Sequence, residues 1–319
     1  MITVLTGGTG GAKFVDGLRQ VVSPEELTII VNTGDDLLWW GLYVSPDLDS
    51  ITYVLAGLLS KERGWGVKGD TFQCLQAMGQ LGQPIWFHAG DRDLAIHLVR
   101  SRLLAEGKTL TEATAEIAGR LGVTAKILPM SNSRVETRVV TPVGELSFEE
   151  YFVQRWYQDP VESVRFAGVA DAEPAPGVLE AIRSASLVLL APSNPITSIG
   201  PILAVPGIRD ALHETRAVIA AVSPIVAGAA VSGPAGILMA SQGLPVSIAG
   251  VARAYSDFLD VLIVDTRDSE NAAELRRGGF RVHCTETVMR SSLEQAALAR
   301  AVLDFVSRTG EAQAATELP

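Results

Sequence analysis

Cysteine and clustered positive charge are both scarce in this chain. It has two cysteines in 319 residues, Cys74 and Cys284, and their separation fits neither a metal-ligand spacing nor a disulfide framework, so we expect reduced thiols. Lysine and arginine total 26 against 36 acidic residues, which gives a formal net charge of −10. Because no basic cluster is present, we expect no binding to the backbone of nucleic acids.

Long hydrophobic runs are missing as well. The longest, residues 217–231, is interrupted by Ser223-Pro224 and is too short to cross a bilayer. The N-terminus shows no basic stretch followed by an apolar one, so no secretory signal is expected. These features predict a cytoplasmic protein with no membrane contact.

Short apolar segments alternate with segments of helical periodicity along most of the chain. This order predicts an α/β, Rossmann-like fold, with a mostly parallel sheet and helices on both of its faces. The expected strands are 1–6, 27–31, 84–87, 187–191, 217–222, 246–249, 261–264 and 280–283. Helices are expected after the first strand, over 49–59, 71–81, 110–121 and 291–306, and from residue 91 to beyond residue 100.

One interruption of this alternation predicts a small inserted unit. Residues 134–140 and 145–153, joined by Thr141-Pro142-Val143-Gly144, have the pattern of a β-hairpin. The sequence therefore predicts a single α/β domain over residues 1–310, with a β-rich insertion at about 130–175. We expect the tail at 311–319 to be frayed.

Two loops with the composition of ligand-binding turns follow predicted strands. Gly7-Gly8-Thr9-Gly10-Gly11-Ala12-Lys13 follows the first strand, and glycines there allow the backbone to approach a phosphate at a helix N-terminus. The spacing is neither that of the dinucleotide-binding fingerprint nor that of a P-loop. A second loop, 192–201, follows the strand at 187–191 and contains Ser193, Asn194 and three prolines. Ordinary helix-capping turns are the alternative, but the pair favours a phosphate or nucleotide site.

Acidic residues recur near predicted strand ends and helix starts. Mg²⁺ in proteins is commonly bound by one or two carboxylates together with phosphate oxygens, so any of these pairs is a candidate metal site. Helix capping is the alternative for each pair, because aspartate is a favoured N-cap residue. The pairs are Asp35-Asp36, Asp47 with Asp49, Asp91 with Asp93, and Asp265 with Asp268.

Several other side chains are candidates for contact with a ligand. The aromatic residues Trp39, Trp40, Tyr43 and Trp65 are suited to stacking on a flat heterocycle, with core packing or a dimer interface as the alternative. His88 follows a predicted strand and precedes Gly90. A helical spacing also places Asp93, His97 and Arg100 on one face, which predicts either a substrate contact or a surface row of ion pairs.

Segments spread over the whole chain resemble those of one known family, the 2-phospho-L-lactate transferase family of coenzyme F420 biosynthesis. The resemblance extends from Met1 to about Val306, and the two most specific segments are 44–49 and 192–201. Trp40 and His88 stand where we expect other residue types in many members. The matching segments are 7–13, 31–33, 44–49, 90–93, 127–131, 192–201, 222–225, 232–235 and 258–260.

The resemblance implies a reaction. The acceptor is Fo, a deazaflavin whose terminal ribityl hydroxyl attacks a guanosine diphosphate ester of lactate or enolpyruvate (the donors LPPG and EPPG). The products are GMP and F420-0 or dehydro-F420-0, and Mg²⁺ is required. The donor acid, including glycerate as a third possibility, stays open, and we expect a homodimer.

The resemblance also implies roles for individual residues. Asp47 and Asp49 bind Mg²⁺ or accept the hydroxyl proton, and Arg92 or Lys13 balances the charge of the transferring phosphate. The donor's nucleotide and phosphates are held by Gly7, Gly8, Thr9, Gly10, Gly11, Lys13, Asn32, Ser193, Asn194 and Pro195. Fo is contacted by Trp40, Tyr43, Asp49 and His88. The main alternative is a regulatory protein of the wider superfamily that binds a nucleotide sugar or a dinucleotide without transferring a group.

Overall fold

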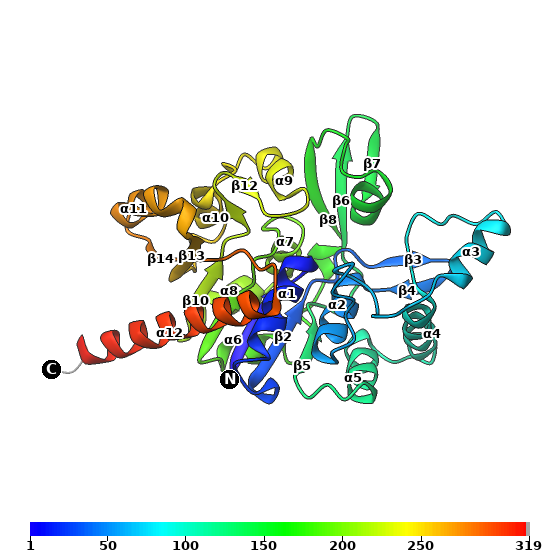
Figure 1. Ribbon diagram of the computed structural model, residues 1–319, viewed down its shortest axis with the longest axis horizontal. Coiled ribbons are helices and arrows are strands. Elements are labelled where there is room, and N and C mark those ends of the chain that lie inside the picture. Colours follow the sequence, from blue (N-terminus) through cyan, green and yellow to red (C-terminus); the bar gives the residue numbers. More distant parts are fainter. Residues whose placement is uncertain (317–319) are drawn as a thin grey trace.

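A sheet of seven parallel strands forms the centre of the protein. In the computed structural model, which describes the backbone of residues 1–316 and the side chains of residues 1–308, the strand order is β14-β13-β10-β9-β1-β2-β5 (Figure 1). This sheet confirms the predicted α/β fold. Its strands are β1 (Ile2–Thr6), β2 (Leu27–Val31), β5 (Lys126–Pro129), β9 (Leu187–Leu190), β10 (Val218–Val222), β13 (Val261–Asp265) and β14 (Arg281–Thr285).

Helices cover both faces of the sheet, as the apolar strands require. One face is covered by α1 (Gly8–Leu18), α2 (Pro46–Leu55), α5 (Leu110–Arg120) and α12 (Ser292–Thr316). The other face is covered by α6 (Val178–Arg183), α7 (Ile199–Ala204), α8 (Ile208–Glu214), α9 (Ala235–Ser241), α10 (Ile248–Ala254) and α11 (Ser269–Arg277). The outlying helices are α3 (Gln73–Gln80) and α4 (Asp91–Ala105).

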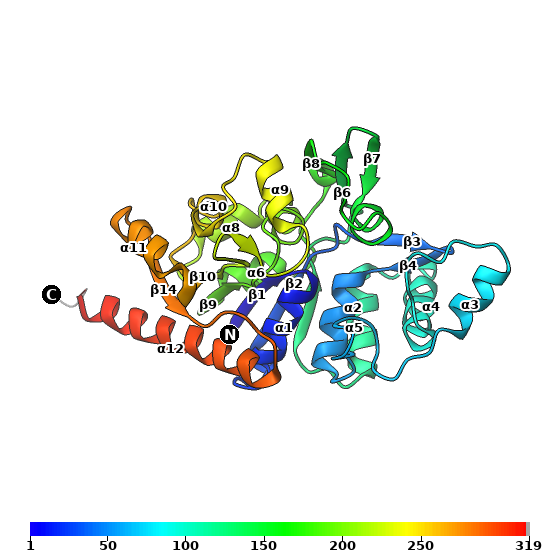
Figure 2. The same ribbon diagram turned by 45° about the horizontal axis from the view of Figure 1, so that its top comes forward.

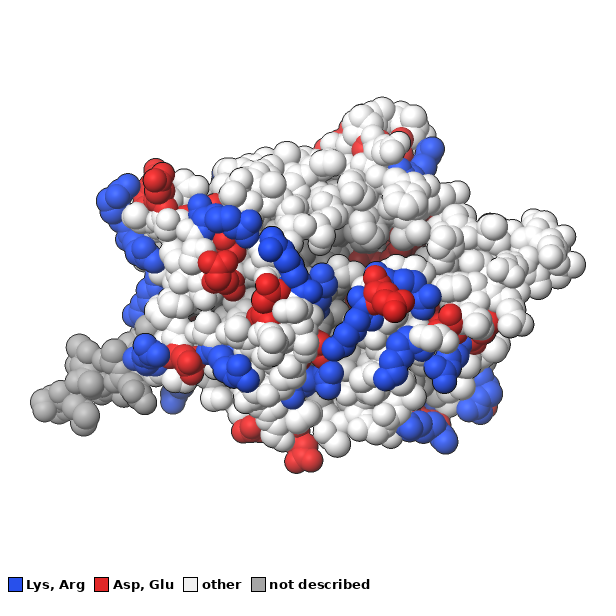
Figure 3. Space-filling model, viewed as in Figure 1, with Lys and Arg blue, Asp and Glu red and all other residues white. Residues whose placement is uncertain are grey.

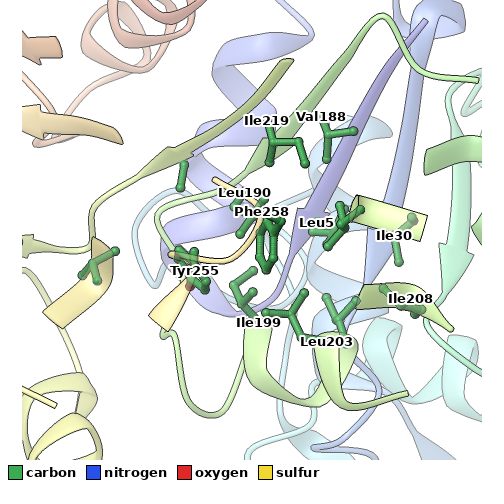
Figure 4. Packing of buried hydrophobic residues seen from close by; sticks show 14 of the residues in the cluster. Leu5, Ile30, Val188, Leu190, Ile199, Leu203, Ile208, Ile219, Tyr255 and Phe258 are labelled. Carbon is green, nitrogen blue, oxygen red and sulfur yellow. The ribbon is translucent and has the colours of Figure 1, made fainter. Parts of the chain in front are cut away.

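Adjacent strand residues point into different cores. Val4 packs under the helices of the first face, whereas Leu5 packs with Val188 and Ile199 on the second face (Figure 4). All four side chains are fully buried, so the strands carry nearly continuous apolar sequence instead of an alternating pattern.

The inserted unit is a separate antiparallel sheet. Strands β6 (Glu136–Thr141) and β7 (Gly144–Ser147) form the predicted hairpin, and a third strand, β8 (Ser163–Ala167), pairs with β6 on its other side. A π-helical turn, Glu150–Gln154, follows β7. Figure 2 shows this sheet next to α9, which contacts β8.

Two predicted strands are absent from the structure, and several observed strands were not predicted. Residues 84–87 form no strand, because Pro84 has no N–H to donate and the segment is largely exposed. The run at 246–249 enters α10, a common outcome for an apolar segment too short to show its period. An unpredicted hairpin, β3 (Leu37–Trp39) with β4 (Leu42–Val44), precedes α2, and β5 was also not predicted.

The C-terminal helix also extends beyond its expected end. Helix α12 continues to Thr316, so part of the tail expected to be frayed is helical, and residues 317–319 lie outside the described part of the chain. A short two-stranded ribbon, β11 (Ile225–Val226) with β12 (Ala229–Ala230), follows β10. Among the described residues, no helix combines the length and the apolar character needed to cross a membrane.

The strand order brings the two candidate loops together. Strand β1 pairs with β2 on one side and with β9 on the other, and the chain leaves β1 in one direction and returns beside it through β9. Such a reversal of strand order opens a crevice at the carboxyl ends of the strands. The glycine loop after β1 and the loop after β9 are therefore neighbours at this edge.

Candidate functional site

The glycine loop is held tightly against its surroundings. Gly7 is the N-cap of α1, and a Cβ atom placed on it would lie 2.6 Å from an Asp47 carboxylate oxygen. A Cβ on Gly10 would collide with the carbonyl oxygen of Pro192. Glycine at these positions lets the backbone N–H groups of the first turn of α1 line the crevice, where they are suited to bind an anion.

The loop after β9 is bonded directly to the glycine loop. The Ser193 hydroxyl donates to the carbonyl oxygen of Gly7 at 2.7 Å and accepts from its N–H at 3.3 Å. Asn194 accepts from the N–H of Ile196 at 3.0 Å, so its carboxamide oxygen shapes the turn, and Pro195 is buried beneath it. The structure thus brings the predicted residues of the loop after β9 against Gly7. Two other predicted residues, Thr9 and Lys13, lie exposed on α1.

Asn32, directly after β2, is a hub between the acidic residues. Its side-chain nitrogen lies 2.9 Å from a carboxylate oxygen of Asp35 and 2.9 Å from one of Asp47. The other oxygen of Asp47 accepts from the N–H of Gly8 at 2.6 Å. The first predicted carboxylate, Asp47, therefore lies at the entrance of the glycine loop.

Four acidic side chains form a carboxylate cluster at this edge: Asp35, Asp36, Asp47 and Glu149. All are buried, at 7 to 8% exposure. Burial raises the pKa of Asp47 to about 6, and it raises the pKa of Asp36 to about 8 against the opposing hydrogen bonds from Ser45 and Tyr43. Burial and then the charge of Asp47 raise the pKa of Glu149 to about 8. Burial, with the charges of Asp47 and Glu149, also holds the pKa of Asp35 well above its usual range.

The cluster has the chemistry of a cation site. One oxygen of Asp35 is buried without a hydrogen-bond partner, as are the hydroxyls of Thr33 and Thr197. Several carboxylates buried close to one another without enough neutralising charge repel each other, and a bound cation would relieve that repulsion. Oxygen ligands of this kind suit Mg²⁺. A recess with acidic atoms at its base opens below the inserted sheet (Figure 3).

Glu149 is the residue that sequence reasoning missed. It precedes the π-helical turn of the inserted sheet, far along the chain from Asp47, and its local sequence, Phe148-Glu149-Glu150, resembles that of any surface segment. Only the folding of the insertion over the sheet edge reveals its position.

Asp49 does not share the surroundings of Asp47, contrary to our expectation of a common metal site. Both of its oxygens accept from the guanidinium of Arg100, one of them at 3.1 Å. The imidazole of His97 lies 3.5 Å from the same carboxylate. Residues two apart on a helix point in nearly opposite directions, which explains why the two aspartates of α2 separate.

Other predicted side chains lie on an outlying arm formed by the β3–β4 hairpin, residues 60–90 and the start of α4, in which the Trp40 indole N–H donates to the carbonyl oxygen of Pro84 at 3.0 Å. Arg92 is exposed and its guanidinium donates to the carbonyl oxygen of Lys68 at 3.2 Å. His88 is exposed and packs beside Trp65, with 6.3 Å between ring centroids. Trp40 has a left-handed backbone with φ of 51°, and its ring lies against that of Trp39 with 5.2 Å between the ring centroids.

Tyr43 connects this arm to the carboxylate cluster. Its hydroxyl donates to Asp36 at 2.8 Å, while its backbone N–H donates to Ser101 of α4. The remaining acidic residues make structural contacts. Asp91 accepts from N–H groups at the start of α3, and Asp265 caps a short 3-10 turn by accepting from the N–H of Arg267. Asp268 caps no helix with its side chain, and it accepts from the N–H of Ala227 in the turn between β11 and β12.

The fold and the site together define an α/β protein with a glycine-rich turn at the start of α1 and a buried carboxylate cluster, both at the carboxyl edge of its sheet. Residues 2–299 match the family described as 2-phospho-L-lactate transferase CofD, and the chain belongs to this family. This result confirms the resemblance seen in the sequence.

Relatives support this membership over nearly their full lengths. A 2-phospho-L-lactate transferase of Methanosarcina acetivorans is 43% identical, over 94% of this chain and 97% of the relative. A phosphoenolpyruvate transferase of Streptomyces griseus is 42% identical, over 95% of this chain and 98% of the relative. A crystal structure of a UPF0052 family member from Bacillus halodurans has the same fold, with a TM-score of 0.62 and 18% sequence identity. The match covers 95% of this chain and 98% of that protein.

Proposed function

We propose that this protein transfers a phospholactyl or phosphoenolpyruvyl group from a guanosine diphosphate-linked donor to the terminal ribityl hydroxyl of Fo. The new bond joins the hydroxyl oxygen to the donor phosphorus that bears the acid, and the diphosphate bridge breaks to release GMP. The observation that carries this proposal is the carboxylate cluster beside the glycine loop. Family membership supplies the class of reaction, and the names of the relatives supply the two donor acids.

The chain's own residues would position the reactants, which is most of what phosphoryl transfer needs. In this proposal the N–H groups at the start of α1 bind the donor phosphates, and the Ser193 loop keeps that turn in place. Lys13, exposed on the same helix, is better placed than Arg92 to approach the transferring phosphate. We assign the deazaflavin ring to the arm, against Trp40 and Tyr43.

Asp35 and Asp47 would hold Mg²⁺, because both are bridged by Asn32 and one oxygen of Asp35 is unpartnered. The ion would supply neutralising charge for the diphosphate. Asp49 is not included, since both of its oxygens already bind Arg100.

Glu149 is our candidate to accept the hydroxyl proton. Burial and the charges of Asp47 and Asp36 raise the pKa of Glu149 to about 8, so its carboxylate is a stronger base than an ordinary glutamate once it is ionised. A cation held by Asp35 and Asp47 would favour that ionised form. Its place on the inserted sheet would put this base opposite the glycine loop.

Binding of Fo tests the proposal first. The fluorescence of Fo would be titrated with purified protein, with and without Mg²⁺ and GDP, and the lactyl, enolpyruvyl and glyceryl donors would then be compared by GMP release. Saturable Fo binding followed by GMP release with one donor is the expected result. Failure to bind Fo, combined with tight binding of a sugar nucleotide or NADP, would instead favour the regulatory class of protein.

A further inference from the structure

A second buried polar group lies behind the carboxylate cluster, between α2 and α4. We call it the α2–α4 ladder, and all its members are 7% exposed or less. They are Asp49 and Tyr53 on α2 and Asp93, His97 and Arg100 on α4. The sequence predicted a shared face for the last three, but the structure buries them instead of placing them on the surface.

The ladder is cross-linked between the two helices. Arg100 binds both oxygens of Asp49, and the Tyr53 hydroxyl donates to Asp93. His97 lies between the two carboxylates, with Nδ1 3.5 Å from Asp49 and Nε2 3.5 Å from Asp93. The ring is 1% exposed, and both of its nitrogens lack a hydrogen bond that meets ordinary geometric limits.

Three of these residues, Asp49, Asp93 and His97, also have ligand atoms close enough together to suggest a metal site. The geometry argues against one. A cation would have to share Asp49 with the Arg100 guanidinium, and the two ring nitrogens face different carboxylates, whereas a metal ion takes only one nitrogen from a ring. The arrangement suits an imidazole that bridges two helices.

We infer that the α2–α4 ladder positions Asp47, with His97 as the residue that sets the distance between α2 and α4. Asp47 begins the same helix that Asp49 anchors, and its two oxygens reach the Gly8 N–H and the Asn32 amide only if α2 is held in place. Buried ion pairs add little net stability compared with apolar packing, so a fixed geometry is the better explanation of their presence. This inference rests on the role proposed for Asp47.

The two ring nitrogens can be tested separately. In His97→Asn the amide nitrogen takes the place of Nδ1 and keeps the contact with Asp49 on the other helix. In His97→Gln it takes the place of Nε2 and keeps only the contact with Asp93, four residues away on the same helix. His97→Leu removes both contacts. Leu103→Ala is the matched control, because Leu103 is buried on the same helix and packs with Ala113 and Ile117 of α5.

Two measurements compare these variants. The amide NMR signal of Gly8 reports its hydrogen bond to Asp47 without any ligand, and Mn²⁺ titration followed by EPR reports the cation site. We expect His97→Asn to keep the Gly8 shift and Mn²⁺ affinity, while His97→Gln and His97→Leu move the signal and weaken Mn²⁺ binding about tenfold, as loss of a supporting contact does in metal sites.

The outcomes separate the inference from the proposed function. An unchanged Gly8 signal in His97→Leu, or changes in the Leu103→Ala control as large as those in His97→Leu, would overturn the positioning role. A wild-type protein that binds no Mn²⁺ and releases no GMP would overturn the proposed metal site and reaction, while the Gly8 signal would still decide whether the ladder places Asp47.

Discussion

Replacement of Glu149 by glutamine is expected to stabilise the fold at alkaline pH. The pKa of this carboxyl group rises from 4.5 to about 8 on folding, because it is buried and faces the charges of Asp47 and Asp36. The folded state therefore binds the proton more tightly than the unfolded chain does. The stabilisation that the folded state gains from this tighter proton binding is complete below pH 4.5 and is lost as the pH rises through 8.

The size of the effect follows from this pKa. At about 1.4 kcal/mol for each pKa unit, the change from 4.5 to about 8 corresponds to about 5 kcal/mol of unfolding free energy, as an upper limit. Glutamine cannot ionise, so the variant avoids the cost that the wild type meets at high pH. Relative to wild type, Glu149→Gln should therefore gain stability between pH 5 and pH 9.

Urea unfolding in EDTA at pH 5, 7 and 9 measures this difference. The control is Glu150→Gln, because a single oxygen of Glu150 accepts from both the N–H and the hydroxyl of Ser147 at 2.8 Å, and the glutamine carbonyl oxygen can accept the same two bonds. We expect the gain at pH 9 only in Glu149→Gln, together with loss of GMP release. An equal difference from wild type at pH 5 and pH 9 would refute the reasoning.

Three further substitutions test other parts of the site. Asp47→Asn should lower turnover about a hundredfold or more, measured as GMP release, with an unchanged circular dichroism spectrum, since the isosteric amide removes charge but little volume. Asp49→Asn should lower the free energy of unfolding by about 3 kcal/mol in urea titrations, because it removes the carboxylate that binds the buried guanidinium of Arg100. Gly10→Ala should weaken binding of GDP by calorimetry, because the added methyl meets the Pro192 carbonyl and displaces the glycine loop; unchanged GDP affinity would contradict the assigned phosphate site.

The sequence predicts most of the sheet and the two loops after β1 and β9 because both depend on local signals. Apolar runs such as 187–190 become central strands wherever helices cover both faces, and a glycine-rich turn after β1 has few other structures available. Gly7 and Ser193 are neighbours because their loops follow β1 and β9, which are adjacent parallel strands.

What the sequence could not provide was the surroundings of each carboxylate. Asp47 and Asp49 look equivalent in the motif, yet one meets Gly8 and the other Arg100, because helix geometry sends them to opposite sides of α2. Glu149 enters the cluster through a tertiary contact of the inserted sheet, for which no local pattern exists. Long-range packing therefore determines the surroundings of each carboxylate, which the spacing in the sequence leaves open.

The two buried polar groups differ in one respect that bears on function. In the α2–α4 ladder, Arg100 neutralises Asp49 directly, so that carboxylate needs no ligand. In the carboxylate cluster, the pKa values of Asp36 and Glu149 are raised to about 8, because burial outweighs the neutralising contacts available. A protein with a net charge of −10 that binds a diphosphate must reverse the local potential with N–H groups and a cation. The poorly neutralised cluster beside the glycine loop is the place in the described structure where a cation would both relieve repulsion and attract the phosphates.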